Sequence, residues 1–381
     1  MKNSNSQAFL PRSLSRLDKE IGECRSLAER NVLFAKKAVG LARHAYIAEA
    51  KVLIANLRAI NSKYDPRLSA WIMFSEGLIE HSETLNNAKS KDRFIRSFLI
   101  SQVANDRELA SASAAWVAHC EFVAGRTKQA AEHISKAFEW STNEHNEARA
   151  RACMLLADGF NMAGDPASAK SWYQQARTHA VMEGDIAMQN AMLFNTAAYH
   201  VAQLTLADCE GEVSERHVKI VALEVASASN LNAALGISSL PSMIPIMRAE
   251  LHVVEKLWLE AIRIFDQYIP ELKSEGQERL LPKMYAQRAW SRANMGDSIR
   301  AEEDLHVACN HIGQCPDFDD LAVLHFRLAG VGRLLKDEDI ERHHQAIASG
   351  YLEKFQEQQA EVTALFSPVA ALALEKIKNP A

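Results

Sequence analysis

The feature that most constrains the fold of this chain is a recurring pair of alanines twelve positions apart. The stretch LLADGFNMAGDPASAKSWYQQA, residues 155–176, holds one such pair, Ala157 and Ala169, on either side of a glycine. Two antiparallel helices joined by a short turn approach closely only where the side chains at their crossing point are small. The pair therefore predicts a tight helical hairpin. The spacing recurs at Ala118 and Ala130, Ala249 and Ala261, Ala289 and Ala301, and less regularly at Ala38 and Ala50.

Turn signals support the same hairpins. Gly125, Gly164 and Gly296 each follow the first alanine of a pair by seven residues, where a helix end favours a residue that tolerates positive φ. Asp165 is expected to cap the second helix, with Pro166 at its first position. Alanine pairs and turn glycines that agree in three places indicate a repeat array.

The repeat has a period of about 40 residues. The first alanines of successive hairpins are 39 to 41 residues apart, except for a step of 51 between Ala198 and Ala249. An insertion is therefore expected near 205–245, with Pro241 and Pro245 marking a helix start or a bend. About eight hairpins are expected, in three segments: basic, loosely repetitive hairpins over 1–110, a regular superhelix over 111–345, and capping helices over 346–381.

Composition narrows the class further. The 381 residues are too many for one compact core, and with 48% hydrophobic residues, 15 Gly and 10 Pro almost every window shows helical periodicity. A net charge of −5 argues against binding of nucleic acid, although residues 1–60 carry 11 Lys or Arg against 5 Asp or Glu. Six scattered cysteines indicate reduced thiols. Without a signal peptide or an 18-residue apolar run, we expect a cytoplasmic protein with no membrane insertion.

Metal and catalytic sites are not expected. His306, Cys309, His311 and Cys315 lie within ten residues, but their spacing matches no zinc finger or ribbon, so we interpret them as repeat packing followed by an acidic loop. The adjacent His343 and His344 would point about 100° apart on a helix. No HExxH motif, catalytic triad or phosphate-binding loop is apparent. The sequence therefore predicts no cofactor, no metal and no catalytic residue.

The hairpin pattern resembles the tetratricopeptide repeat (TPR). The places that carry this resemblance best are Ala157, Phe160, Gly164, Ala169, Tyr173 and Ala176. The long period is similar to that of superhelical TPR regions in bacterial sensor and regulator proteins. The resemblance implies an all-α fold, a right-handed α-solenoid of antiparallel helix pairs, whose first helices line a concave groove for proteins, peptides or small ligands. We find neither a helix-turn-helix nor a nucleotide-binding loop, so either the chain acts alone as an adaptor or its output partner is a separate protein.

Residues just after the first alanines are expected to face this groove. Trp290 follows Ala289 directly and should turn about 100° away from the packing face, whereas the other five tryptophans should fill space between repeats. Glu250 holds the equivalent place after Ala249. The predicted groove residues are His119, Phe122, Asp158, Asn161, Met162, Tyr199, Gln203, Trp290 and Asn294.

Three functions remain open at this point. The leading one is a non-enzymatic scaffold or adaptor that binds a protein segment or peptide in the groove. The alternative is a regulatory protein that responds to a small ligand or peptide and acts through a separate output partner. The third is an enzyme with a hidden site near 205–245. The partner's identity and the oligomeric state are left open by the sequence.

Overall fold

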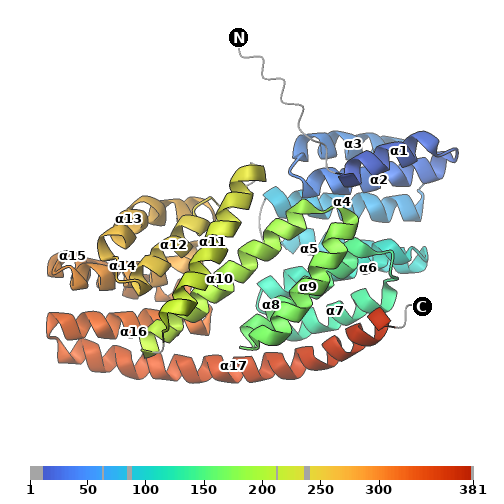
Figure 1. The fold of residues 1–381 in the computed structure, drawn as a ribbon. Coiled ribbons are helices and arrows are strands. Elements are labelled where there is room, and N and C mark those ends of the chain that lie inside the picture. The colour runs from blue at the N-terminus through green and yellow to red at the C-terminus, as the bar shows by residue number, and fades with distance from the viewer. Residues whose placement is uncertain (1–11, 62–63, 84–87, 212, 236–240, 379–381) are drawn as a thin grey trace, which may run out of the picture. The chain divides into compact units, whose positions relative to one another are not determined.

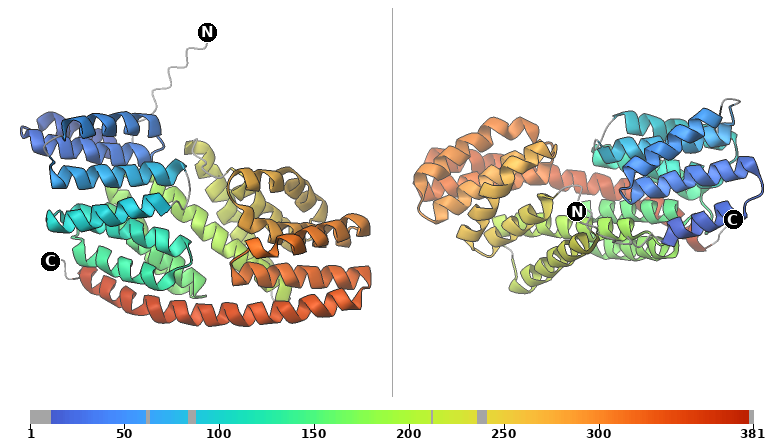
Figure 2. Two further views of the ribbon diagram at one scale, coloured as in Figure 1. Left: turned by 180° about the vertical axis from the view of Figure 1, so that it is seen from behind. Right: turned by 90° about the horizontal axis from the view of Figure 1, so that it is seen from above.

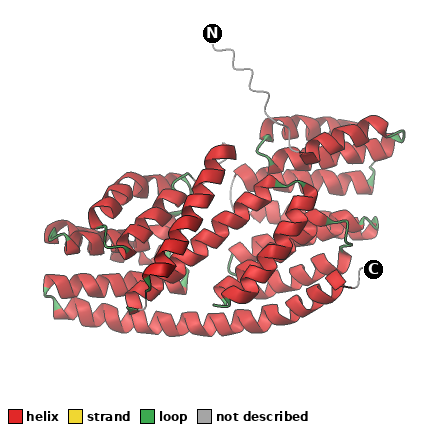
Figure 3. Ribbon diagram, viewed as in Figure 1, coloured by secondary structure: helices red, strands yellow, loops and turns green. Residues whose placement is uncertain are grey.

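The computed structural model describes residues 12–61, 64–83, 88–211, 213–235 and 241–378 (Figure 1). Over these ranges the chain is all-α and contains no strand (Figure 3). The α-helices are α1 Arg12–Glu23, α2 Leu27–Arg43, α3 Ile47–Ile60, α4 Pro66–Glu83, α5 Ala88–Val103, α6 Arg107–Val123, α7 Thr127–Trp140, α8 Asn146–Met162, α9 Pro166–Glu183, α10 Ile186–Glu210, α11 Glu215–Leu235, α12 Met243–Val254, α13 Trp258–Ser274, α14 Leu281–Asn294, α15 Ser298–His311, α16 Phe318–Leu335 and α17 Glu338–Lys378.

The chain forms two compact units. Unit 1 comprises Met1–Met192 and Val362–Ala381, and unit 2 comprises Leu193–Glu361. The three segments expected from sequence (1–110, 111–345 and 346–381) were defined by the regularity of the repeat and not by contacts between helices. That division therefore stays a prediction. The expectation of separate capping helices is wrong, because α17 is one uninterrupted helix that passes through Pro368 (Figure 2, left).

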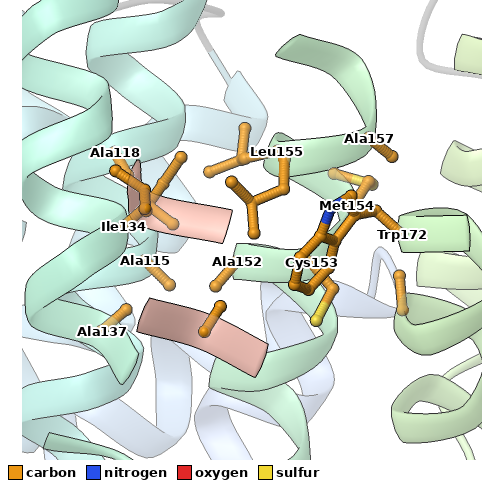
Figure 4. Packing of buried hydrophobic residues seen from close by; sticks show 14 of the residues in the cluster. Ala115, Ala118, Ile134, Ala137, Ala152, Cys153, Met154, Leu155, Ala157 and Trp172 are labelled. Atoms are coloured by element: carbon orange, nitrogen blue, oxygen red, sulfur yellow. The ribbon is translucent and has the colours of Figure 1, made fainter. Parts of the chain in front are cut away.

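Antiparallel hairpins build both units. In unit 1, α2 pairs with α3, α4 with α5, α6 with α7 and α8 with α9, and in unit 2, α12 pairs with α13 and α14 with α15. All ten alanines of the five predicted pairs are at most 1% exposed, which confirms their role as crossing points. Figure 4 shows Ala118 and Ala157 among the larger side chains of the unit 1 core, such as Leu155 and Trp172.

The turns of the hairpins share one backbone conformation. Gly125, Gly164 and Gly296 have φ of 72°, 74° and 81°, as the glycine spacing predicts. The same left-handed conformation occurs seven residues after the first alanine in three further hairpins, where the residue is not glycine: Ala45, Lys256 and Lys336, with φ of 64°, 60° and 60°. The turn geometry is therefore imposed by the packing of the helices rather than by the residue.

The predicted insertion is helical. Helices α10 and α11 have 25 and 21 residues, longer than the 12 to 18 of the other helices before α17. They pack with α12 in one apolar cluster that includes Val201, Val225 and Met247. Pro241 stands just before α12 and Pro245 lies in its first turn, as expected for a helix start. Residues 212 and 236–240 lie outside the described ranges.

Candidate functional site on the first helices

The first helices of the hairpins are α2, α4, α6 and α8 in unit 1, and α12, α14 and α16 in unit 2. Five of the nine predicted groove residues lie on α6 and α8 of unit 1. The other four lie on α10 and α14 and belong to unit 2. Each unit is therefore considered by itself.

Two of the three predicted groove residues of α8 are buried, and the third, Met162, is half-buried. Asp158 is 3% and Asn161 2% exposed, so the expectation that they line an open groove is wrong. The Tyr173 hydroxyl donates a hydrogen bond to Asp158 Oδ1. A buried carboxylate needs such a donor to offset its lost hydration.

The last residues of the chain pack on the same helices. We call residues 362–378 of α17 the α17 tail. The ring of Phe366 lies against Gly159, where a Cβ atom would come within 2.3 Å of it, and its centre is 6.1 Å from that of Phe122. Arg149 Nη2 also donates to the backbone oxygen of Lys376 at 3.3 Å. The buried members of the tail are Val362, Phe366, Val369, Ala370 and Ala373, all in the main core cluster of unit 1.

His119 belongs to an aromatic cluster on α4, α5 and α6, against which Arg151 of α8 packs. Its ring centre lies 5.5 Å from that of Trp116 and 5.4 Å from that of His81, in edge-to-face geometry. Phe94 stacks on Trp116 at 5.3 Å. The guanidinium carbon of Arg151 lies 3.5 Å from the centre of the Trp116 ring, so the cation stacks on the indole.

A cavity of about 140 Å³ lies beside this cluster. It is bounded by all four first helices of unit 1 and by the start of α10. The first helices of this unit therefore do line a hollow, but the residues that line it are not those predicted from sequence. Arg43, at its rim, forms ion pairs with Glu147 and Asp185. The lining residues are Ala42, Arg43, Leu78, Ser82, Trp116, Arg151, Ala187, Met188 and Ala191.

Burial sets the protonation states of the cluster. Burial, followed by the charge of Arg43, lowers the pKa of Arg151 to about 9, so the guanidinium remains charged at neutral pH. Burial, followed by the charge of Arg151, lowers the pKa of His81 to about 4. The same causes hold the pKa of His119 well below its ordinary value. Both imidazoles are therefore neutral at pH 7, and each carries one N–H donor.

In unit 2 the predicted residue Trp290 takes part in packing. Its ring lies against Gly330, where a Cβ atom would come within 2.5 Å, and its centre is 6.2 Å from that of Trp258. The expectation that Trp290 alone turns away from inter-repeat packing is therefore wrong. The Asn294 side chain donates to the backbone oxygen of Trp290 at 2.8 Å. Tyr199 and Gln203 are half-buried on α10.

A buried ionic network links the first helices of unit 2. Lys283 Nζ lies 2.8 Å from Glu250 and 2.7 Å from Asp320, and these two carboxylates raise the pKa of the lysine although its burial opposes them. Arg327 donates to Gln287 at 3.0 Å and to Asp208 at 2.6 Å. Glu250 was placed on the groove by sequence, but here it is buried and paired.

Sequence reasoning missed Arg151 and Lys283, although a signal existed. Each precedes the first alanine of its hairpin, Ala157 or Ala289, by six residues, so the two cations occupy the same place in the repeat. A search for charged residues at this position of the apolar first helices would have found both.

The histidines and cysteines near residue 310 do not form one cluster. His306 is exposed, and the Cys315 thiol lies 3.8 Å from the backbone oxygen of Asp317. The Cys309 sulfur instead lies 3.9 Å from Nε2 of His344. The other ring nitrogen of His344, Nδ1, lies 2.8 Å from Nδ1 of His325. Among the described residues, no group of three or more His, Cys, Asp or Glu is placed to hold a metal ion.

No helix in the described ranges is both long and apolar enough to span a bilayer. All six cysteines lie within those ranges and are free thiols.

No model of a known protein family matches the chain, and no curated protein matches it either.

Proposed function

We propose that this protein is a non-enzymatic, TPR-like adaptor of the cytoplasm that holds an amphipathic helix of a protein partner on the first helices of unit 1. The observation that supports the proposal is the α17 tail, which already lies on that face as a helix. It presents Phe366 to Gly159 and Phe122. An apolar helix face laid on a solenoid or groove is a recurring mode of peptide recognition.

The geometry favours a particular kind of helix. Because Gly159 has no side chain, an aromatic ring can approach the backbone of α8, which a Cβ atom would prevent. Arg149 then donates a hydrogen bond to a backbone carbonyl near the C-terminal end of the helix. A matching partner would carry one aromatic residue followed by small apolar residues at helical spacing, as the tail does with Val369, Ala370 and Ala373.

Occupation by the tail makes the adaptor regulated. A tethered helix competes at an effective concentration on the order of millimolar, so a free partner helix binds only in proportion to the fraction of molecules whose tail is released. The output of release would pass to a separate partner protein.

The test uses a fluorescent peptide of residues 361–378 with the full-length chain. In the wild type the tail blocks its own site, and anisotropy should rise little. In Phe366→Ala the tail loses its buried ring, which costs about 3–5 kcal/mol, so the open fraction and the apparent affinity for the peptide should rise roughly 100-fold or more.

Two further variants make the test specific. Gly159→Ala should release the tail but also exclude the peptide, so its binding should stay weak. Leu374→Ala alters a residue of the same helix that is 43% exposed, and should behave as the wild type. A folded Phe366→Ala variant that binds no peptide would rule out helix recognition by this face.

A second function, regulation by a small ligand, is favoured by a separate observation. The cavity of unit 1 joins α2, α4, α6 and α8 to the start of α10, so an occupant would contact all four hairpins at once. A ligand that binds only one arrangement of these helices stabilises that arrangement.

A further inference from the structure

Arg151 is the least compensated charge among the buried residues of unit 1. Only 8% of its surface is exposed, and it forms no hydrogen bond or ion pair within the described residues. The ring of Trp116 covers one face of the guanidinium and supplies no acceptor. A buried guanidinium without acceptors is costly, because its five N–H donors lose their hydration.

Two other arginines of unit 1, Arg43 and Arg149, have hydrogen-bond or ion-pair partners and serve as a comparison. Arg43 is paired with the carboxylates of Glu147 and Asp185. Arg149, two residues from Arg151, donates to Ser141, Asn143 and the backbone of Lys376. The absence of any such partner is therefore particular to Arg151 in this part of the described chain.

Other donors near Arg151 are also unsatisfied. Trp116 Nε1 and Arg151 Nε are buried and find no acceptor among the described residues, and Nδ1 of His81 and of His119 likewise has no partner there. Asp185 accepts from the Met188 backbone and caps α10, whose positive end thus borders the cavity. Trp116 and Arg151 both line the cavity, so an N–H donor and a cation without acceptors border the space.

The rest of the lining is apolar and small. Leu78, Met188 and three alanines supply the apolar lining. The volume of about 140 Å³ is close to that of an engineered cavity that binds benzene. Such a space suits a compact molecule with one polar end.

We propose that this cavity binds a small organic carboxylate, whose carboxylate group pairs with Arg151 and whose apolar body packs against Leu78 and Met188. The carboxylate matches the fork of the guanidinium, which can donate two parallel hydrogen bonds. The other charges close by are Arg43, Glu147 and Asp185, which neutralise one another in part, and Asp158, which is bound by Tyr173. The inference develops the small-ligand function above and is independent of helix exchange, because Phe366, Gly159 and Phe122 do not line the cavity.

Thermal unfolding and calorimetric titration of the full-length chain test the site. The probes are benzoate and hexanoate, with benzamide as the neutral analogue and inorganic phosphate as an anion without an apolar body, all at constant ionic strength. Benzoate or hexanoate should raise Tm in a saturable way, since a ligand that binds only the folded state stabilises it. Benzamide and phosphate should bind at least 10-fold more weakly.

Variants locate the effect. Arg151→Met should weaken benzoate binding at least 10-fold, while Arg96→Met, the same change at an exposed arginine of α5, should leave it unaltered. If Arg151→Met does not fold, Arg151→Lys serves, and an unchanged benzoate affinity there overturns the proposal. A wild type without a saturable response to either carboxylate, a response that survives in Arg151→Met, or binding of phosphate alone also overturns it. The peptide assay above does not involve these probes, so either proposal can fail without the other.

Discussion

Arg151 and Lys283 occupy the same place in two different repeats, six residues before the first alanine, yet their surroundings are opposite. Lys283 has two carboxylates within 3 Å, those of Glu250 and Asp320. Arg151 has an indole ring and a cavity. One position of the hairpin thus holds a structural ion pair in unit 2 and an unpaired cation in unit 1.

This difference predicts opposite effects on stability. Lys283→Met should lower the free energy of unfolding by about 3–5 kcal/mol, because it leaves two buried carboxylates without a cation. Arg151→Met in the absence of ligand should raise it, by about 1–2 kcal/mol, because an uncompensated buried charge is replaced by an apolar side chain. Urea denaturation at pH 7 measures both. A loss in Arg151→Met as large as that in Lys283→Met would contradict the interpretation of Arg151 as a ligand-binding residue.

The turns give a prediction about backbone strain. Lys256 and Lys336 hold φ of 60°, a conformation that costs a residue with a Cβ atom about 1 kcal/mol or more. Lys336→Gly should therefore stabilise the chain by up to about 1 kcal/mol, whereas Gly164→Ala should destabilise it by about 1–2 kcal/mol. Gly350 of α17 has ordinary φ and open space around it, so Gly350→Ala is the control and should be stabilising. The midpoint of thermal unfolding reports all three.

Buried histidines predict a loss of stability in acid. Burial lowers the pKa of His44, His81, His179, His325 and His344 to about 4 in the folded chain. Between pH 6.5 and 4 the unfolded chain binds protons that the folded chain does not, so stability falls as the pH falls through this window. Denaturation at pH 5 and pH 7 should show this slope.

The variant His81→Gln should make the slope shallower by about one proton. His306 is exposed, so His306→Gln is the control and should leave the slope unchanged. Asp319 acts in the opposite direction, because burial and the neighbouring Asp320 raise its pKa to about 7. Stability that rises toward pH 5 in the His81→Gln variant and in the wild type alike would show that the carboxyl outweighs the histidines.

Gly77 packs against Phe94, a member of the aromatic cluster. A Cβ atom there would come within 2.7 Å of the Phe94 ring, which stacks on Trp116. Gly77→Ala should thus shift Phe94, lower the free energy of unfolding by about 1–3 kcal/mol and change the fluorescence of Trp116. Gly22 in α1 has nothing within 4 Å, and Gly22→Ala should produce neither effect. An unaltered spectrum in Gly77→Ala would separate Trp116 from this packing.

The hairpins could be predicted from sequence because their determinants are local. Ala157 and Ala169 lie twelve residues apart, and the rule that a close crossing needs two small side chains acts within that span. Asp165, which accepts from the Ser168 backbone at 3.0 Å, follows from a cap rule of similar range. Such signals specify each hairpin without reference to the others.

The candidate site could not be predicted in the same way, because its determinants are distant in sequence. Phe366 meets Gly159 across more than two hundred residues, and no periodic pattern relates them. The capping helices expected over 346–381 are instead part of α17, which continues through Pro368 although proline removes a backbone donor. The angular offset placed Asp158 and Asn161 on a free face, but it did not include contacts with other helices, such as the hydrogen bond from Tyr173 of α9 to Asp158.

The α17 tail also sets the order in which unit 1 can be completed. The hairpins of this unit end before residue 192, but Phe366 and its neighbours in the core are synthesised much later. At ordinary translation rates the intervening chain takes on the order of ten to forty seconds to make. During that interval the newly synthesised hairpins expose the apolar face that the α17 tail later covers. A chaperone or a partner helix can bind this face before the tail does.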